Sequence, residues 1–126
     1  MTTTPKKVLC IEDDTFLVNL IMGKLSEAGI LAIGAHNGAE GLAQAATEKP
    51  SLIMLDLMLP DMRGNEVLLR LKEDEITKHI PVIIFSNLAE REEIEKAKAQ
   101  GAANYLIKSS TLPSEVLEVV QKELGI

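Results

Sequence analysis

The sequence predicts an α/β fold in which a sheet of five parallel strands is covered by helices. Five short apolar runs alternate along the chain with segments whose apolar residues recur at helical spacing. The runs are partly β-branched and are bounded by Gly, Pro or Asn, which is typical of strands. A regular alternation of strand and helix indicates a parallel sheet with helices on both faces.

The five predicted strands differ in how continuously apolar they are. They are expected at 7–12, 30–35, 51–56, 81–86 and 103–108. The first, third and fourth are the most continuous, so we expect them at the centre of the sheet, with the other two at its edges. Right-handed crossovers then favour strand order 2-1-3-4-5, a doubly wound, flavodoxin-like (βα)5 sheet. Its crevice lies between the first and third strands, at their carboxyl ends.

Helices are expected between the strands and after the last one. Their predicted ranges are 15–28, 38–48, 64–73, 88–100 and 113–124. The first has an apolar stripe at i, i+3 and i+4 spacing, formed by Leu17, Leu20, Ile21, Leu25 and Ala28. The fourth is mostly charged and has only Ile94 and Ala97 as its main apolar anchors.

Length and composition exclude several classes of protein. A chain of 126 residues is expected to form a single domain over 1–126. Its net charge of −6 argues against non-specific binding to nucleic acid or to an anionic membrane. No apolar run is long enough for a membrane helix, and residues 1–7 do not resemble a signal peptide. Cys10 is the only cysteine, so an intrachain disulfide is impossible and a cytoplasmic location fits.

Acidic residues end two of the predicted central strands. Glu12 and Asp13 end the first strand, and Asp56 ends the third, where it interrupts a run of apolar residues. A carboxylate in such a setting is costly to desolvate unless something compensates its charge. Because the carboxyl ends of parallel strands share one edge, the three acids should lie close together and repel one another. A divalent cation would relieve the repulsion, and oxygen ligands on a rigid edge suit Mg²⁺ with several waters retained.

The fourth strand ends at Ser86, and the fifth ends at Lys108. Each of these polar residues has a simpler interpretation when taken alone. Asp14 suits the N-cap of helix 15–28, whose N-terminus also favours nearby acids, and Asn87 with Glu90 resembles a capping box. A single lysine is usually solvated. The joint pattern of acids, a hydroxyl group and a lysine at the ends of four strands favours a functional site.

At these residues the chain resembles the CheY-like response-regulator receiver domains over about its whole length. "VLCIEDD" resembles the first strand of the family with its acid pair. "NGAEGLAQAATEKPSLIMLDLMLPDMRGNEVLLRLK" resembles the middle section, including Leu59-Pro60 and Gly64 after the phosphorylated aspartate. "PVIIFSN" and "GAANYLIKS" resemble the last two strands.

The resemblance implies a phosphoacceptor and a metal site. Asp56 would accept a phosphoryl group from the phosphohistidine of a sensor histidine kinase or phosphotransfer protein. Asp13 and Asp56 would bind Mg²⁺ directly, together with the main-chain carbonyl of Met58. Glu12 would act largely through water. The protein would be a signalling switch that assists its own phosphorylation and dephosphorylation, and not an enzyme.

The resemblance also implies a switch. Ser86 would hydrogen-bond a phosphoryl oxygen, Lys108 would pair with the phosphoryl group, and Tyr105 would turn inward after activation. The surface formed by helix 88–100, strand 103–108 and helix 113–124 would then change. Two further positions, here Met58 and Leu88, flank the approach of the hydrolytic water in the family, and both side chains are apolar. We therefore expect slow hydrolysis.

Three residues depart from the family pattern. Ser109 stands where proline usually follows the lysine, so the usual cis peptide is in doubt, because a cis bond before serine costs about 3–4 kcal/mol. Asn87 replaces a small Ala or Gly. Arg63 replaces a frequent acid, and nothing in the sequence explains it.

Two other functions share some of these features. A phosphatase of the haloacid-dehalogenase type also uses a nucleophilic Asp with Mg²⁺, but it needs an acid two residues later, where this chain has Met58. A flavodoxin-like electron carrier would need aromatic side chains around its flavin, and this chain has no Trp. The sequence leaves open the kinase, the output partner and whether phosphorylation drives homodimer formation.

Overall fold

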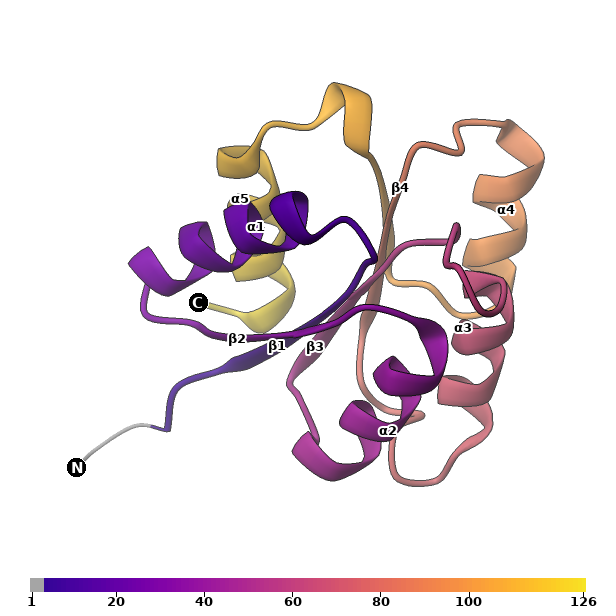
Figure 1. The fold of residues 1–126 in the computed structure, drawn as a ribbon, viewed down its shortest axis with the longest axis horizontal. Helices are drawn as coiled ribbons and strands as arrows, with labels where there is room; N and C mark the ends of the chain where they lie inside the picture. The colour runs from indigo at the N-terminus through magenta and orange to yellow at the C-terminus, as the bar shows by residue number, and fades with distance from the viewer. Residues whose placement is uncertain (1–3) are drawn as a thin grey trace.

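Residues 4–126 are described by a computed structural model, in which five strands and five α-helices alternate (Figure 1). The elements are β1 (Lys7–Ile11), α1 (Thr15–Glu27), β2 (Leu31–Ala35), α2 (Gly38–Glu48), β3 (Leu52–Leu55), α3 (Gly64–Glu73), β4 (Val82–Ser86), α4 (Arg91–Ala99), β5 (Asn104–Ile107), the short 3-10 turn η1 (Lys108–Ser110) and α5 (Pro113–Leu124). All strand pairs are parallel, in the order β2-β1-β3-β4-β5. The predicted flavodoxin-like fold and strand order are therefore confirmed.

The sheet is the middle layer of three, with α1 and α5 on one face and α2, α3 and α4 on the other (Figure 1). Alternate residues of each central strand supply the two cores, since successive side chains of a strand point to opposite faces. In β1, Leu9 and Ile11 pack toward α2 and α3, whereas Val8 and Cys10 pack toward α1 and α5. β3 and β4 are buried along their whole length, as their continuous apolar runs predict.

The buried stripe of α1 differs from the predicted one. Val18, Ile21 and Leu25 are buried, whereas Leu20 is 46% exposed and Ala28 is also exposed. Val18 and Leu20 cannot both face the sheet, because two residues span about 200° around a helix. The helix begins as predicted, with the Asp14 carboxylate accepting a hydrogen bond from the Leu17 amide at 3.1 Å.

The fourth helix begins at Arg91, three residues later than predicted. Its N-cap is Glu90, which makes no side-chain capping bond, and the predicted capping box is wrong. The Asn87 side chain instead accepts a hydrogen bond from the Ser109 amide. Of the two predicted anchors, Ala97 is fully buried and Ile94 is only half-buried.

The loop between β3 and α3 is held tightly against the sheet. Met58 and Arg63 form an antiparallel bridge, and the Gly64 amide donates to the Leu57 carbonyl at 2.9 Å. A Cβ on Gly64 would collide with the Asp56 carbonyl oxygen and with Leu57 Cα, so only glycine fits at this position. The close approach fixes the chain that directly follows Asp56.

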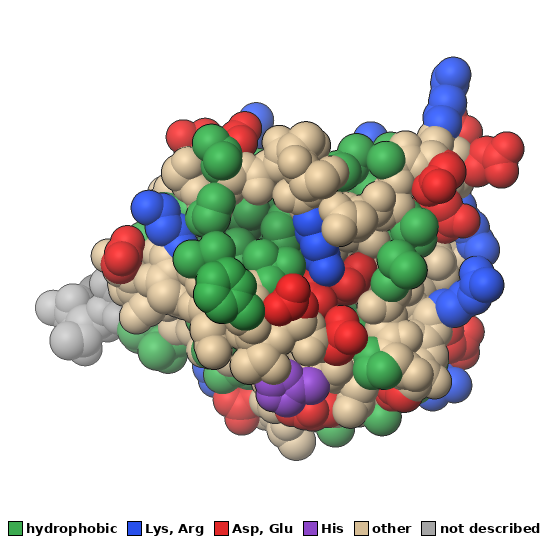
Figure 2. Space-filling model, turned by 45° about the horizontal axis from the view of Figure 1, so that its top comes forward, with side chains coloured by type: hydrophobic (Ala, Val, Ile, Leu, Met, Phe, Trp, Pro, Cys, Tyr) green, Lys and Arg blue, Asp and Glu red, His purple; other side chains and the backbone are tan. Residues whose placement is uncertain are grey.

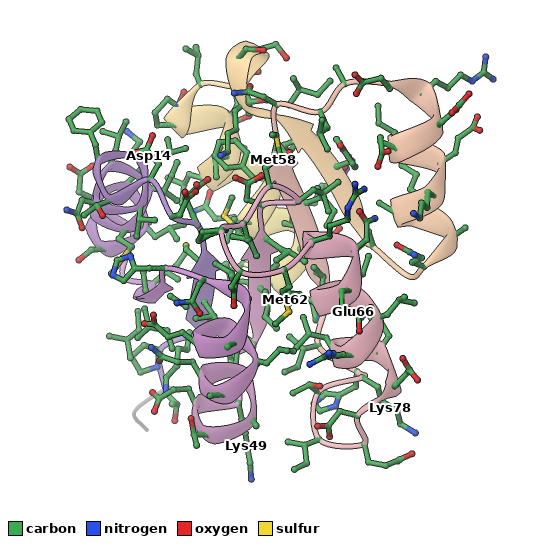
Figure 3. All side chains as sticks on the ribbon, turned by 45° about the vertical axis from the view of Figure 1, so that its right-hand side comes forward. Asp14, Lys49, Met58, Met62, Glu66 and Lys78 are labelled. Carbon is green, nitrogen blue, oxygen red and sulfur yellow. The ribbon has the colours of Figure 1, made fainter. Side chains whose placement is uncertain are left out.

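The tip of this loop is hydrogen-bonded to the start of α2. The Asp61 carboxylate accepts hydrogen bonds from the Gly38 and Ala39 amides at 2.7 and 2.9 Å. The Met62 side chain extends between α2 and α3 (Figure 3), where a Cβ on Gly38 would meet it. No helix among residues 4–126 combines the length and the apolar character needed to cross a bilayer.

Candidate functional site

Two acids lie where β1 and β3 end side by side. Ile11 and Leu55 are paired across the two strands, and the Asp56 amide donates to the Ile11 carbonyl at 3.0 Å. This register places Glu12 and Asp56 at the same level, and both are buried. Carboxylate oxygens of Glu12, Asp13 and Asp56 all lie within 4.8 Å of one another, and Asp13 is exposed. The structure thus brings together the three acids that the sequence singled out.

Asp56 is 4% exposed, and each of its carboxylate oxygens has a partner. Oδ1 accepts a hydrogen bond from the Met58 amide at 3.1 Å, and Oδ2 accepts one from Lys108 Nζ at 2.8 Å. The first partner belongs to the β3–α3 loop and the second to the turn after β5. The carboxylate is therefore held in one orientation by groups from both sides of the site.

Lys108 is the cation of this site. Its ammonium forms ion pairs with both Glu12 and Asp56. Burial by itself would lower the pKa of Lys108, but hydrogen bonds to Asp56 and Glu12 outweigh this effect, and the net result is a raised pKa. The ammonium also lies over the Phe85 ring, 6.0 Å from its centroid. The lysine is therefore charged over the whole range in which the acids ionise.

Burial raises the pKa of Glu12 from 4.5 to about 6, and the neighbouring charge of Asp56 adds to the rise. Hydrogen bonds from Lys108 and from the Asp14 amide oppose it. Three acids with carboxylate oxygens within 4.8 Å of one another thus face the Lys108 ammonium, and a further positive charge beside them would reduce their mutual repulsion.

The donor set fits a hard divalent cation. Carboxylate oxygens are the ligands that Mg²⁺ prefers, and the exposed Asp13 leaves room for retained waters. Met58 is 59% exposed and belongs to the loop that crosses above the carboxyl ends of the strands (Figure 3). In Figure 2, red side chains gather around a blue one near the centre of this face, beside an apolar hollow. Cys10 lines a pocket between β1 and α1 together with Glu12 and Asp56, but burial raises the pKa of its thiol to about 12, so it is an unreactive core residue.

Ser86 ends β4 and is fully buried. Its hydroxyl oxygen accepts a hydrogen bond from the Leu88 amide at 3.3 Å. In the parallel sheet β4 lies next to β3, so Ser86 ends on the same edge as Asp56. The peptide bond between Lys108 and Ser109 is trans, as are the other peptide bonds of residues 4–126.

Tyr105 lies on β5 and contacts the loop after β4. Its hydroxyl donates a hydrogen bond to the Leu88 carbonyl, and its side chain packs against the core beneath α4. Burial raises the pKa of the tyrosine, and the charges of Glu93, Glu90 and Asp56 add to this. The ring is thus already joined to the segment that follows Ser86.

An open groove runs from the acids between the β3–α3 loop and α4. Asp13, Met58, Leu88 and Glu93 are among the residues that line it. The two apolar positions that were expected to flank the hydrolytic water therefore share one groove beside the acid cluster.

Sequence reasoning missed Asp61. It lies outside the acid cluster, yet its two hydrogen bonds to the start of α2 tie the loop that carries Met58 to another element. Those bonds lower the pKa of Asp61. No local pattern could have indicated the contact, because donor and acceptor are separated by 22 and 23 residues.

Comparison with known proteins agrees with this geometry. A family model described as "Response regulator receiver domain" matches residues 8–121. The chain belongs to that family. The polar-differentiation response regulator DivK of Brucella anthropi is 32% identical over 121 residues, which are 96% of this chain and 98% of DivK. The resemblance inferred from the motifs is therefore confirmed.

Solved structures agree as well. A CheY-like receiver domain protein from Methanospirillum hungatei superposes with a TM-score of 0.90 at 27% identity, covering 97% of this chain and 95% of the other. The receiver domain of Francisella response regulator 1452 superposes with a TM-score of 0.88 at 30% identity, covering 95% and 97%. Receiver domains are signalling switches of two-component systems and interact with histidine kinases or phosphotransfer proteins. They generally bind Mg²⁺ at an acidic site, and Glu12, Asp13 and Asp56 form such a cluster here.

Proposed function

We propose that this receiver domain accepts a phosphoryl group on Asp56 from the phosphohistidine of a sensor kinase or phosphotransfer protein, in a Mg²⁺-dependent reaction. The observation that carries the proposal is the buried Asp56 carboxylate, held by Lys108 and the Met58 amide beside two further acids. A buried carboxylate among like charges is costly, and this chemistry gives the arrangement a use.

In the proposed transfer, one carboxylate oxygen of Asp56 forms a bond to phosphorus while the bond between phosphorus and the imidazole nitrogen breaks. The imidazole keeps the electron pair and takes up a proton from solvent, and Asp56 becomes an acyl phosphate. The transferring group carries negative charge on its outer oxygens, so fixed positive charge lowers the barrier. When bound, Mg²⁺ would supply part of that charge, with Asp13, Asp56 and the Met58 carbonyl as its protein ligands and Glu12 acting through water.

Lys108 and Ser86 have separate roles in this proposal. Lys108 pairs with Asp56 before transfer and with a phosphoryl oxygen afterwards, so the ammonium never loses its anionic partner. Ser86 hydrogen-bonds a phosphoryl oxygen, which draws the end of β4 toward Asp56. Because Leu88 is bonded to both Ser86 and Tyr105, movement of Ser86 is expected to alter the packing of Tyr105. We propose α4, β5 and α5 as the output surface.

The rival phosphatase and flavodoxin functions have less support. A haloacid-dehalogenase phosphatase needs an acid two residues after the nucleophile, and Met58 cannot serve as an acid. A flavin carrier would need aromatic rings beside the crevice, whereas the groove there is lined mainly by aliphatic and charged side chains. A cytoplasmic location also fits signalling by soluble phosphotransfer.

The first prediction tests the acceptor. In the presence of Mg²⁺ and acetyl phosphate, the purified chain should gain one phosphoryl group on Asp56, measured by intact mass and peptide mapping. Removing Mg²⁺ with a chelator should reduce labelling strongly, because the acids then repel the anionic donor. Asp56→Asn should not be labelled. Label on another residue of the wild type would show that the acceptor is wrongly assigned.

A further inference from the structure

A single hydrogen bond joins the two loops that carry Ser86 and Lys108. Asn87 Oδ1 accepts from the Ser109 amide at 3.0 Å, across 22 residues of sequence. Asn87 directly follows Ser86 at the end of β4, and Ser109 directly follows Lys108 at the start of η1. The bond therefore ties together the residues next to two predicted phosphoryl contacts.

The turn that carries Lys108 is held from within mainly through Thr111, whose hydroxyl donates to the Ile107 carbonyl at 2.7 Å. The Ser110 hydroxyl donates to the same carbonyl at 3.4 Å, and the backbone bond from the Thr111 amide to the Lys108 carbonyl is long at 3.5 Å. None of these three bonds involves the Ser109 amide, which donates to Asn87. The Ser109 N–H belongs to the same peptide unit as the Lys108 carbonyl. Fixing that N–H therefore fixes the backbone from which the Lys108 side chain leaves.

The chemistry of both residues suits this bond. An asparagine side chain supplies the acceptor, whereas an alanine or glycine at 87 would supply none. The donor is a backbone N–H, so any residue at 109 except proline provides it. The Asn87 side chain makes no capping bond to α4, and its oxygen accepts a hydrogen bond from the turn that follows β5.

We propose that Asn87 is a positioning residue for phosphoryl transfer, and that it acts by holding the Lys108 turn beside Asp56. This inference rests on the proposed function. Lys108 must reach both Glu12 and Asp56, and its ammonium lies 2.8 Å from Asp56 Oδ2. Without the tie, the peptide unit between Lys108 and Ser109 loses the bond that its N–H makes to the neighbouring loop, and the ammonium spends less time at the acceptor.

The same tie gives Lys108 a link to Ser86. The loop after β4 has a second bond to β5, from the Tyr105 hydroxyl to the Leu88 carbonyl. The Leu88 bond connects the loop to Tyr105, and the Asn87 bond connects it to Lys108. Asn87 thereby holds the two phosphoryl contacts in a fixed relation across the acceptor.

The test measures the rate of Asp56 phosphorylation by acetyl phosphate at saturating Mg²⁺. Asn87→Ala should lower this rate about three- to tenfold, the range expected for one hydrogen bond of ordinary strength. Ser109→Ala keeps the backbone donor and should leave the rate unchanged, so it is the matched control. In a Lys108→Ala background, Asn87→Ala should have almost no further effect, because Asn87 acts through Lys108.

Amide hydrogen exchange provides a readout that does not depend on phosphorylation. In Asn87→Ala, exchange at the Ser109 amide should become faster, whereas exchange in β1 and β3 and the melting temperature should not change. The inference is overturned if Asn87→Ala is phosphorylated at the wild-type rate, or if it slows the reaction equally with and without Lys108. A wild type that is not labelled on Asp56 at all would instead overturn the proposed function, and the inference with it.

Discussion

At the scale of single residues, the site is a balance of charges. Glu12, Asp13 and Asp56 bring three acids together, and Lys108 offers one ammonium in return. Burial raises the pKa of Glu12, and the neighbouring charge of Asp56 adds to this rise. The excess of acids over ammonium groups supports the proposed Mg²⁺ site, because a cation bound there would offset the repulsion among the acids and toward an anionic phosphoryl group.

The lifetime of the proposed acyl phosphate is also decided by single residues. Hydrolysis needs a water in line with phosphorus, on the side opposite the Asp56 oxygen. Met58 and Leu88 line the groove on this side, and neither can orient a water by hydrogen bonding. We therefore expect slow spontaneous hydrolysis. Met58→Asn combined with Leu88→Glu should shorten the lifetime by about tenfold or more, within the range that positioned polar groups supply.

The measurement is the decay of phosphoprotein in excess Mg²⁺ after the donor is removed. Each single variant serves as a control for the other, and equal starting levels of label exclude an effect on phosphorylation alone. Equal decay of the wild type and the double variant would show that these side chains do not control the water.

Gly64 sets the geometry of the acceptor through its backbone. Gly64→Ala should lower the free energy of unfolding by about 1–3 kcal/mol, because the new methyl group meets the Asp56 carbonyl and Leu57 Cα. Gly23→Ala is the matched control, since nothing lies within 4 Å of its added methyl group and Gly23 is inside α1. The control should stabilise the protein by up to about 1 kcal/mol. Denaturant unfolding of both variants checks the prediction, and equal effects would contradict it.

At the scale of elements, the site depends on loops that hold one another. The β3–α3 loop is closed by the bridge between Met58 and Arg63, and its tip is bound to α2 through Asp61. The loop after β4 is bound to β5 and to η1 through Leu88 and Asn87. Rigid strands bring the acids together, and these loop contacts then orient the remaining groups.

Asp61 should make the stability of the loop depend on pH. Its hydrogen bonds to the Gly38 and Ala39 amides lower its pKa below the usual 3.8. A lowered pKa in the folded state means that the stabilisation is present above pH 3.8 and is lost as the pH falls through the folded value. Asp61→Ala should therefore lower the melting temperature at pH 7, and the difference from wild type should shrink below pH 4. Thermal melts across pH check this, and a difference that is constant with pH would contradict it.

The order of the strands and the grouping of the three acids could both be predicted from the sequence. The strand order followed from how continuously apolar each run is, and the grouping of the acids followed from the shared edge of parallel strands. The start of α4 could not be predicted, because the residues from 88 to 90 suit a helix as well as a loop. The use of Asn87 was missed for a related reason. Its local spacing to Glu90 suggests a cap, whereas its actual partner, Ser109, is brought close only by the folded sheet.

At the scale of the whole molecule, α4 is anchored less firmly than the other helices of the described residues. α1 has three buried residues and α3, on the same face as α4, has five, whereas α4 has only Ala97. A helix with few buried contacts opens and shifts at low cost. α4 also follows directly on the loop that joins Ser86 to Tyr105. The molecule therefore combines a firm acceptor site with one weakly packed neighbour.

The weak packing of α4 predicts which amides respond to phosphorylation. After labelling with acetyl phosphate and Mg²⁺, amide hydrogen exchange should change mainly in α4, β5 and α5, because α4 is weakly packed and follows the loop of Ser86, while β5 and α5 flank the turn that carries Lys108. Lys108→Ala should still be phosphorylated to some extent, but its exchange pattern on that surface should respond less than in wild type. Asp56→Asn, treated identically, controls for donor and metal. Changes confined to residues 15–48 would contradict the prediction, since α1 and α2 are packed away from the β4–β5 edge through which the signal must pass.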